Sequence, residues 1–176
     1  MQARDLILQA QAARRQGRLA DALRDFESAA DAARRDGGAD DLIASLKGVG
    51  QIERDMGHAE AALARYLEAA ALCRAALAPL PLAHTLRHIA DLHHEAGRAD
   101  EALAHYQEAL ALYRSAGPAP LDLANTLRPM GMMMQERGEP SAARALFAEA
   151  RDLYAAAGVR QGAAECTARI AKLGSA

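Results

Sequence analysis

The stretch that decides the fold is residues 83–114, AHTLRHIADLHHEAGRADEALAHYQEALALYR. Gly97 divides this stretch into two segments that contain no proline and many alanines. Alanine makes up about a quarter of the whole chain, a share that favours helix over strand. The stretch therefore predicts two helices that are joined by a tight turn at Gly97.

The same pattern occurs four times along the chain. Gly97 belongs to a series of glycines separated by 40, 40 and 41 residues, namely Gly17, Gly57, Gly97 and Gly138. Five other positions, which we call repeat columns, recur at fixed distances from these glycines. They hold a leucine eleven residues before each glycine, a small residue seven before, alanines five and twelve after, and an aromatic ring nine after. The small residues allow two helices to approach closely, and the ring fills the gap between neighbours. Such units bury their apolar faces by stacking on one another.

This combination of columns resembles the tetratricopeptide repeat, in a long-period form similar to the repeats of kinesin light chain and of bacterial regulatory proteins. The resemblance implies an all-α fold, a right-handed α-solenoid of four helix pairs in a single domain over residues 1–176. We expect repeats at approximately 3–38, 41–78, 81–117 and 121–157, with a C-terminal capping helix at 159–173. The helices are predicted at 3–16, 19–35, 41–56, 59–76, 82–96, 99–115, 121–137 and 140–156.

The resemblance also marks a ligand surface, because in this family the first helix of each pair lines a concave groove. Carried over by their offset from the repeat glycine, the groove residues are Arg4, Arg14, Lys47, Gln51, Arg54, His84, Arg87, His88, Asp91, His94, Asn125, Arg128 and Met132. Six of them are basic and one is acidic, in a chain with a formal net charge of −2.

Guanidinium groups bind carboxylates and phosphates, so these groove residues predict an acidic protein or peptide partner that lies along an extended ladder of positive charges. On this interpretation Arg87 and Arg128 should be exposed. A solvated helix face is the alternative explanation of the same charges.

Four of the six histidines lie close together in the third repeat: His84, His88, His93 and His94. On a helix, His84 and His88 share a face with Asp91, a spacing that suits a metal such as zinc. The favoured interpretation is still that these are polar groove and packing residues, with no metal and no cofactor. No nucleophile with a base and an orienting group can be assembled, so we expect no enzyme activity. A metal-dependent enzyme that uses these histidines is the alternative.

Composition narrows the remaining function classes. A pI near 6.3 argues against a nucleic-acid binder, and nowhere do 18 apolar residues run together, which argues against a membrane span. Cys73 and Cys166 stand far apart in sequence, so we expect free thiols and a cytoplasmic location.

The sequence therefore predicts a non-enzymatic scaffold that holds a protein or peptide in its groove. The alternative is a self-associating structural repeat module, for example a homodimer. That alternative would apply if the terminal helix left its apolar stripe exposed.

Overall fold

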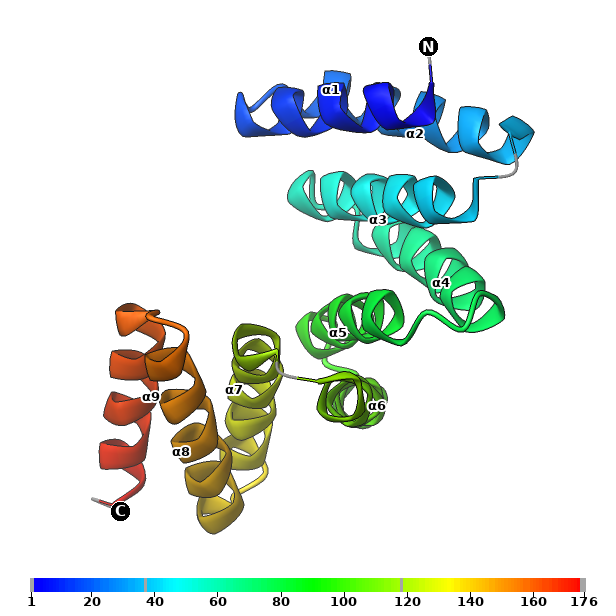
Figure 1. The fold of residues 1–176 in the computed structure, drawn as a ribbon. Coiled ribbons are helices and arrows are strands. Elements are labelled where there is room, and N and C mark those ends of the chain that lie inside the picture. Colours follow the sequence, from blue (N-terminus) through cyan, green and yellow to red (C-terminus); the bar gives the residue numbers. More distant parts are fainter. Residues whose placement is uncertain (1, 37, 118, 175–176) are drawn as a thin grey trace. The chain divides into compact units, whose positions relative to one another are not determined.

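The computed structural model describes residues 2–36, 38–117 and 119–174. Across these ranges the chain forms nine α-helices and no strand (Figure 1). The helices are α1 (Ala3–Arg15), α2 (Leu19–Asp36), α3 (Ala39–Asp55), α4 (Ala59–Ala75), α5 (Pro79–Glu95), α6 (Ala99–Ala116), α7 (Pro120–Glu136), α8 (Pro140–Ala156) and α9 (Arg160–Leu173). The prediction of an all-α repeat fold with a C-terminal helix is confirmed.

The largest difference from the predicted helices is at the start of α5, which begins at Pro79 rather than at residue 82. Residues 79–81, which lie between the predicted helices 59–76 and 82–96, form the first turn of this helix. The first N–H groups of a helix have no acceptor within it, so a proline is tolerated there. Helices α7 and α8 likewise start at prolines, Pro120 and Pro140.

The contacts between residues group the chain into two compact units, with the boundary between Leu92 and His93 inside α5. We call residues up to Leu92 unit 1 and residues from His93 unit 2. In unit 1, α1 packs against α2, α2 against α3, and α3 against α4. In unit 2, α6 packs against α7, α7 against α8, and α8 against α9. Each unit is thus a stack of consecutive helices, and the single domain over residues 1–176 stays a prediction.

The repeat columns form the core of both units. The ring column, which consists of Phe26, Tyr66, Tyr106 and Phe147, is buried throughout. In two repeats the small residue before the turn is a glycine in contact with such a ring. A Cβ placed on Gly50 would lie 3.1 Å from Tyr66, and one placed on Gly131 would lie 2.8 Å from Phe147. The small residues are therefore needed to seat the rings.

One loop departs from the backbone pattern of the repeats. The turns that lead from a second helix to the next first helix place Gly117 and Gly158 at positive φ. Leu77 stands at the same position of the preceding turn, also at a positive φ of 52°, and its side chain is 88% exposed. This conformation is unfavourable for a residue with a Cβ, so unit 1 carries local backbone strain at Leu77.

Helix α9 covers the last helix pair of unit 2. Cys166 is fully buried, and a Cβ on Gly162 would lie 2.8 Å from the Tyr154 ring. None of the helices that the structure describes has the length and the apolar run required to cross a membrane.

Candidate ligand-binding site

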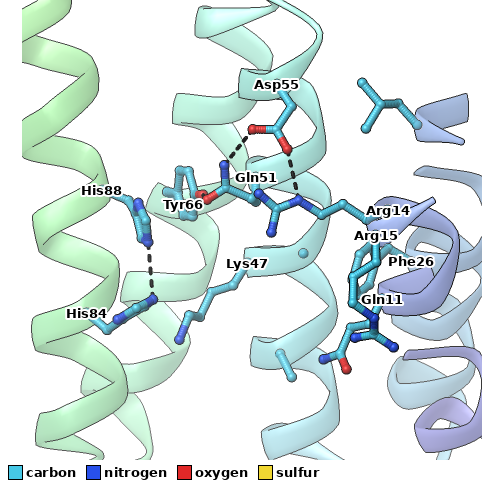
Figure 2. Close-up of a pocket in the computed structure, with 13 residues that line it drawn as sticks. Gln11, Arg14, Arg15, Phe26, Lys47, Gln51, Asp55, Tyr66, His84 and His88 are labelled. Atoms are coloured by element: carbon cyan, nitrogen blue, oxygen red, sulfur yellow. Dashed lines mark hydrogen bonds and ion pairs between the residues drawn. The ribbon is translucent and has the colours of Figure 1, made fainter. Parts of the chain in front are cut away.

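Unit 1 contains a cavity of about 690 Å³ that is bordered by the first helices of three consecutive repeats, α1, α3 and α5 (Figure 2). Five of the predicted groove residues line it, namely Arg14, Lys47, Gln51, His84 and His88. Its other lining residues are Gln11, Arg15, Leu19, Phe26, Ala44, Gly48, Asp55 and Tyr66. The structure thus brings together groove residues that lie up to 74 positions apart in the sequence. Arg4 is exposed on α1 and does not belong to this lining.

Two aromatic rings reach the cavity from the second helices of their repeats. A Cβ on Gly48 would overlap the Phe26 ring, so the absence of a side chain lets this ring lie against α3. The Tyr66 ring stacks on His88, with the ring centroids 5.1 Å apart and an interplanar angle of 10°. Apolar ring surface therefore lies beside the charged side chains of the cavity.

Asp55 organises one side of the cavity (Figure 2). Arg14 Nε donates to Asp55 Oδ2 at 2.9 Å, and Gln51 Nε2 donates to Asp55 Oδ1 at 2.8 Å. The carboxylate therefore ties α1 to α3 and fixes the Arg14 side chain. Sequence reasoning missed Asp55, although it lies four residues after Gln51 and so on the same helix face.

The opposite side of the cavity holds two histidines that are in direct contact. His84 Nε2 lies 3.1 Å from His88 Nε2, and Arg87 Nη2 lies 3.2 Å from the same His88 nitrogen. A guanidinium can only donate, so His88 Nε2 is an acceptor and the His88 proton resides on Nδ1. His84 Nε2 must then donate as well, which leaves the lone pair of the neutral His84 ring on Nδ1.

Burial is the main reason why both rings are neutral. It lowers the pKa of His84 to about 3, and the charges of Lys47 and Arg87 act in the same direction. Burial likewise lowers the pKa of His88 to about 2, with further contributions from Arg87, His84, Arg54 and Lys47. This side of the cavity is therefore a positively charged environment in which the imidazoles resist protonation.

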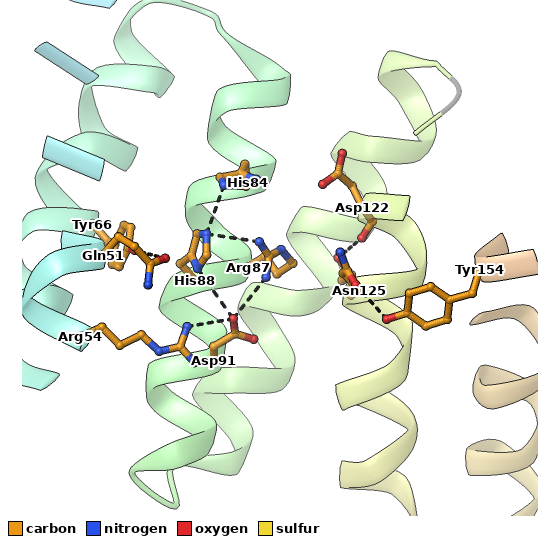
Figure 3. Close-up of polar contacts among 11 residues, drawn as sticks. Gln51, Arg54, Tyr66, His84, Arg87, His88, Asp91, Asp122, Asn125 and Tyr154 are labelled. Atoms are coloured by element: carbon orange, nitrogen blue, oxygen red, sulfur yellow. Dashed lines mark hydrogen bonds and ion pairs between the residues drawn. The ribbon is translucent and has the colours of Figure 1, made fainter. Parts of the chain in front are cut away.

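Asp91 is an acidic residue of the same helix, and two arginines contact it (Figure 3). Its Oδ2 atom lies 3.3 Å from Arg54 Nη1, 3.3 Å from Arg87 Nη1 and 3.8 Å from His88 Nδ1. The Arg87 side chain is only 14% exposed. The expectation of an exposed Arg87 is therefore wrong, because this residue is held in a partly buried ion pair.

The histidine pair is poorly suited to a metal ion. His88 Nε2 already accepts from a guanidinium, and the charges of Lys47 and Arg87 oppose the approach of a cation. Among the described residues, no group of three or more histidine, cysteine or acidic side chains is arranged to hold a metal. The local chemistry favours an anion instead.

The groove residues of unit 2 form a different arrangement. Arg128 Nη1 donates to Glu165 Oε2 of α9 at 2.7 Å. Arg169 donates to the other Glu165 oxygen at 3.3 Å, and its guanidinium lies 5.7 Å from the centroid of the Phe147 ring. Partial burial raises the pKa of Glu165, but Arg128 and Arg169 outweigh this effect and hold it below its usual value. Glu165 is thus an ionised partner for both cations.

The remaining predicted residues of unit 2 also have partners within the unit or are partly buried. Tyr154 Oη donates to Asn125 Oδ1 at 2.8 Å (Figure 3), and His94 Nε2 lies 3.5 Å from Glu136 Oε2. Met132 is partly buried on α7.

The predicted ladder of positive charges lies among acidic side chains. Four of its members lie in ion pairs with Asp55, Asp91 or Glu165: Arg14, Arg54, Arg87 and Arg128. Glu165 could have been found from the sequence, since it follows Asn125 by 40 residues and thus keeps the repeat spacing. That spacing makes α9 equivalent to the first helix of a further repeat.

A family model for the tetratricopeptide repeat matches residues 5–75 and 81–156. The chain belongs to the tetratricopeptide repeat family. Repeats of this family generally serve as scaffolds for protein interactions. No curated protein matches the sequence significantly.

Solved structures share the fold of this tetratricopeptide repeat protein at low sequence identity. The apo form of RapI gives a TM-score of 0.86 at 14% identity, over 93% of this chain and 60% of that chain. BtubC (BKLC) from P. vanneervenii gives 0.72 at 17% identity, over 94% and 77% of the two chains. A protein with kinesin light chain TPR-like repeats from Podosopora anserina gives 0.70 at 16% identity, over 98% and 94%.

Proposed function

We propose that this protein is a non-enzymatic scaffold that binds an acidic protein segment in the cavity of unit 1. The observation that carries the proposal is the set of basic side chains around this cavity: Arg14, Arg15 and Lys47 line it. Lys47 and Arg128 stand at the same repeat position. Arg128 contacts Glu165 on the next first helix, and Lys47 lies near His84 there (Figure 2).

The cavity of unit 1 therefore keeps an excess of positive charge. Lys47, Arg14 and Arg15 line it, and Asp55 is the acidic residue among its lining. Arg14 holds Asp55 through Nε, and a guanidinium has five N–H donors, so it can bind a ligand carboxylate as well. The contact between Arg128 and Glu165 illustrates, in the same protein, the kind of interaction that we expect between Lys47 and its ligand.

The size and walls of the cavity support a peptide rather than a single small anion. A volume of about 690 Å³ accommodates several side chains, and the rings of Phe26 and Tyr66 supply apolar contact. Cys73 and Cys166 are buried free thiols, which agrees with the cytoplasmic location that we include in the proposal.

Selection from a library of random peptides tests the proposal directly. Wild-type protein should enrich sequences rich in Asp and Glu, and the dissociation constant of a selected peptide can then be measured at low and high salt. Lys47→Glu should weaken binding at least tenfold, equivalent to about 1.4 kcal/mol. Binding by wild type should also weaken with salt, because the charges are then screened.

Lys172→Glu is the matched control, since it makes the same charge change on an exposed position of α9 in unit 2. It should alter the affinity less than twofold. Enrichment of neutral or basic peptides, or equal effects of the two substitutions, would refute the proposed acidic specificity. Light scattering of each variant would show whether a change in self-association accounts for a change in binding.

A further inference from the structure

The histidine pair gives the cavity one basic atom that its internal hydrogen bonds do not use. In the pair, His88 Nε2 accepts from both Arg87 and His84. The hydrogen bonds therefore place the His84 lone pair on Nδ1, as shown above. A proton that enters the pair binds at this atom without breaking either contact.

The groups that face the pair in unit 1 are mostly cationic. Lys47 and Arg54 face it from α3, Tyr66 from α4, and Arg87 and Asp91 from α5. Asp91 lies 3.8 Å from His88 Nδ1, on the side of the pair away from the His84–His88 contact (Figure 3). Lys47 and Arg87 are the charges that act on His84, and an anion bound beside Lys47 would offset them.

We propose that an acidic group bound beside Lys47 is accompanied by a proton taken up at His84 Nδ1, so that the cavity binds acidic segments more tightly as the pH falls. This inference rests on the proposed function. No covalent bond changes, since the proton comes from solvent and converts neutral His84 into an imidazolium. The imidazolium then donates from Nδ1 to the ligand carboxylate while Nε2 still donates to His88.

The thermodynamic linkage between proton binding and ligand binding determines whether the affinity rises or falls with pH. In the free protein, burial together with the charges of Lys47 and Arg87 keeps His84 neutral at pH 5.5. A ligand carboxylate offsets those charges and favours the protonated ring, so proton uptake and ligand binding must strengthen each other equally. The affinity for the ligand rises only when the pH falls below the pKa that His84 has in the complex. Below that pKa the increase approaches tenfold in affinity for each pH unit.

The test uses a blocked peptide probe, acetyl-AEAEAEA-amide, and its uncharged equivalent, acetyl-AQAQAQA-amide. Glutamate remains mostly ionised from pH 7.5 to pH 5.5, so the charge of the probe changes little. The dissociation constant of the acidic probe should fall at least threefold over this range. Calorimetry in two buffers of different ionisation enthalpy should show greater proton uptake at pH 5.5 than at pH 7.5.

Three variants assign the effect to the correct residue. His84→Gln should bind the acidic probe with a dissociation constant that does not change with pH. His58→Gln is the matched control, because His58 is a partly exposed histidine of unit 1 that pairs with Glu53 outside the cavity lining. It should retain the wild-type pH dependence. His88→Gln should reduce the dependence, because it removes the acceptor that orients His84.

The outcomes separate this inference from the function on which it rests. Binding of the acidic probe that is equal at both pH values refutes proton uptake and leaves the proposed function intact. Failure to bind the acidic probe at either pH, or equal binding of the uncharged probe, refutes the acidic specificity itself. A pH dependence that persists in His84→Gln shows that another group takes up the proton.

Discussion

Unit 1 and unit 2 are built from the same repeat, yet they treat their groove cations differently. In unit 1, Lys47 faces a neutral histidine and a cavity lies beside it. In unit 2, the equivalent Arg128 is bound by Glu165 of α9. A repeat column therefore predicts where a side chain lies, whereas the next helix decides which group its charge meets.

The largest expected effect concerns the buried histidines of unit 1. In the unfolded chain, His84 and His88 take up protons near pH 6.5, but in the fold burial holds their pKa values at about 3 and about 2. Stability should therefore be full above pH 6.5 and decline as the pH falls below it. From pH 7 to pH 5 the two residues together should lower the free energy of unfolding by about 4 kcal/mol, as measured by urea denaturation.

A double variant isolates this contribution. His84→Gln with His88→Gln should show a much flatter dependence on pH between 7 and 5. Parallel losses of stability in wild type and in the double variant would show that the histidines titrate in the fold as they do in solution.

A smaller effect is expected at the glycines that seat aromatic rings. Gly48→Ala should cost about 3 kcal/mol, because its Cβ would overlap Phe26. Gly131→Ala in unit 2 should cost less, about 2 kcal/mol, because the Phe147 ring would lie 2.8 Å away. Gly38→Ala is the control, since the nearest atom there would be 3.8 Å away. Thermal unfolding that ranks the three in another order would contradict this assignment.

A still smaller effect is expected for the ion pair between Arg128 and Glu165 in unit 2. Glu165→Gln should lower the free energy of unfolding by about 1 kcal/mol at pH 7, because the pair is 37% exposed and partly screened. The pKa of Glu165 is lowered in the fold, so its contribution is present above the ordinary pKa of 4.5 and is lost as the pH falls through the lower folded value.

Asp152→Asn serves as a control for this prediction. Asp152 pairs with its neighbour Arg151 at the surface, and its replacement should leave the unfolding midpoint unchanged both at pH 7 and below the folded pKa of Glu165. If both substitutions give the same result, Glu165 does not differ from a solvated carboxylate.

The smallest effect concerns the turns between repeats. Leu77→Gly should raise the free energy of unfolding by about 0.5 kcal/mol, because the φ of 52° at this position suits glycine but glycine also gains freedom in the unfolded chain. Gly158→Ala in unit 2 should lower it by a similar amount, since φ is 75° there. Melting temperatures that move in the same direction for both variants would show that backbone strain does not control these turns.

The sequence predicted the helices and the groove positions well because both follow from the repeat spacing. Five predicted residues line the cavity, among them Lys47 and His84. The repeat spacing assigned Arg87 and Arg128 to an open surface, because it gives the position of a side chain and not its contacts. Asp91, four residues after Arg87 on the same helix, and Glu165 of α9 bind them. The cavity itself also depends on how Phe26 and Gly48 meet across two repeats, which no single repeat reveals.

The ring column has a consequence for how this protein can be recombined. Three rings contact the residue that follows them by 22 positions: Phe26 meets Gly48, Tyr66 meets His88, and Phe147 meets Arg169. If the third repeat were joined directly to the first, His88 would replace Gly48 against Phe26, where even a methyl group has no room. The first repeat is therefore not freely exchangeable, because Phe26 requires a residue without a side chain at this position of the repeat that follows it, and Gly48 supplies that residue.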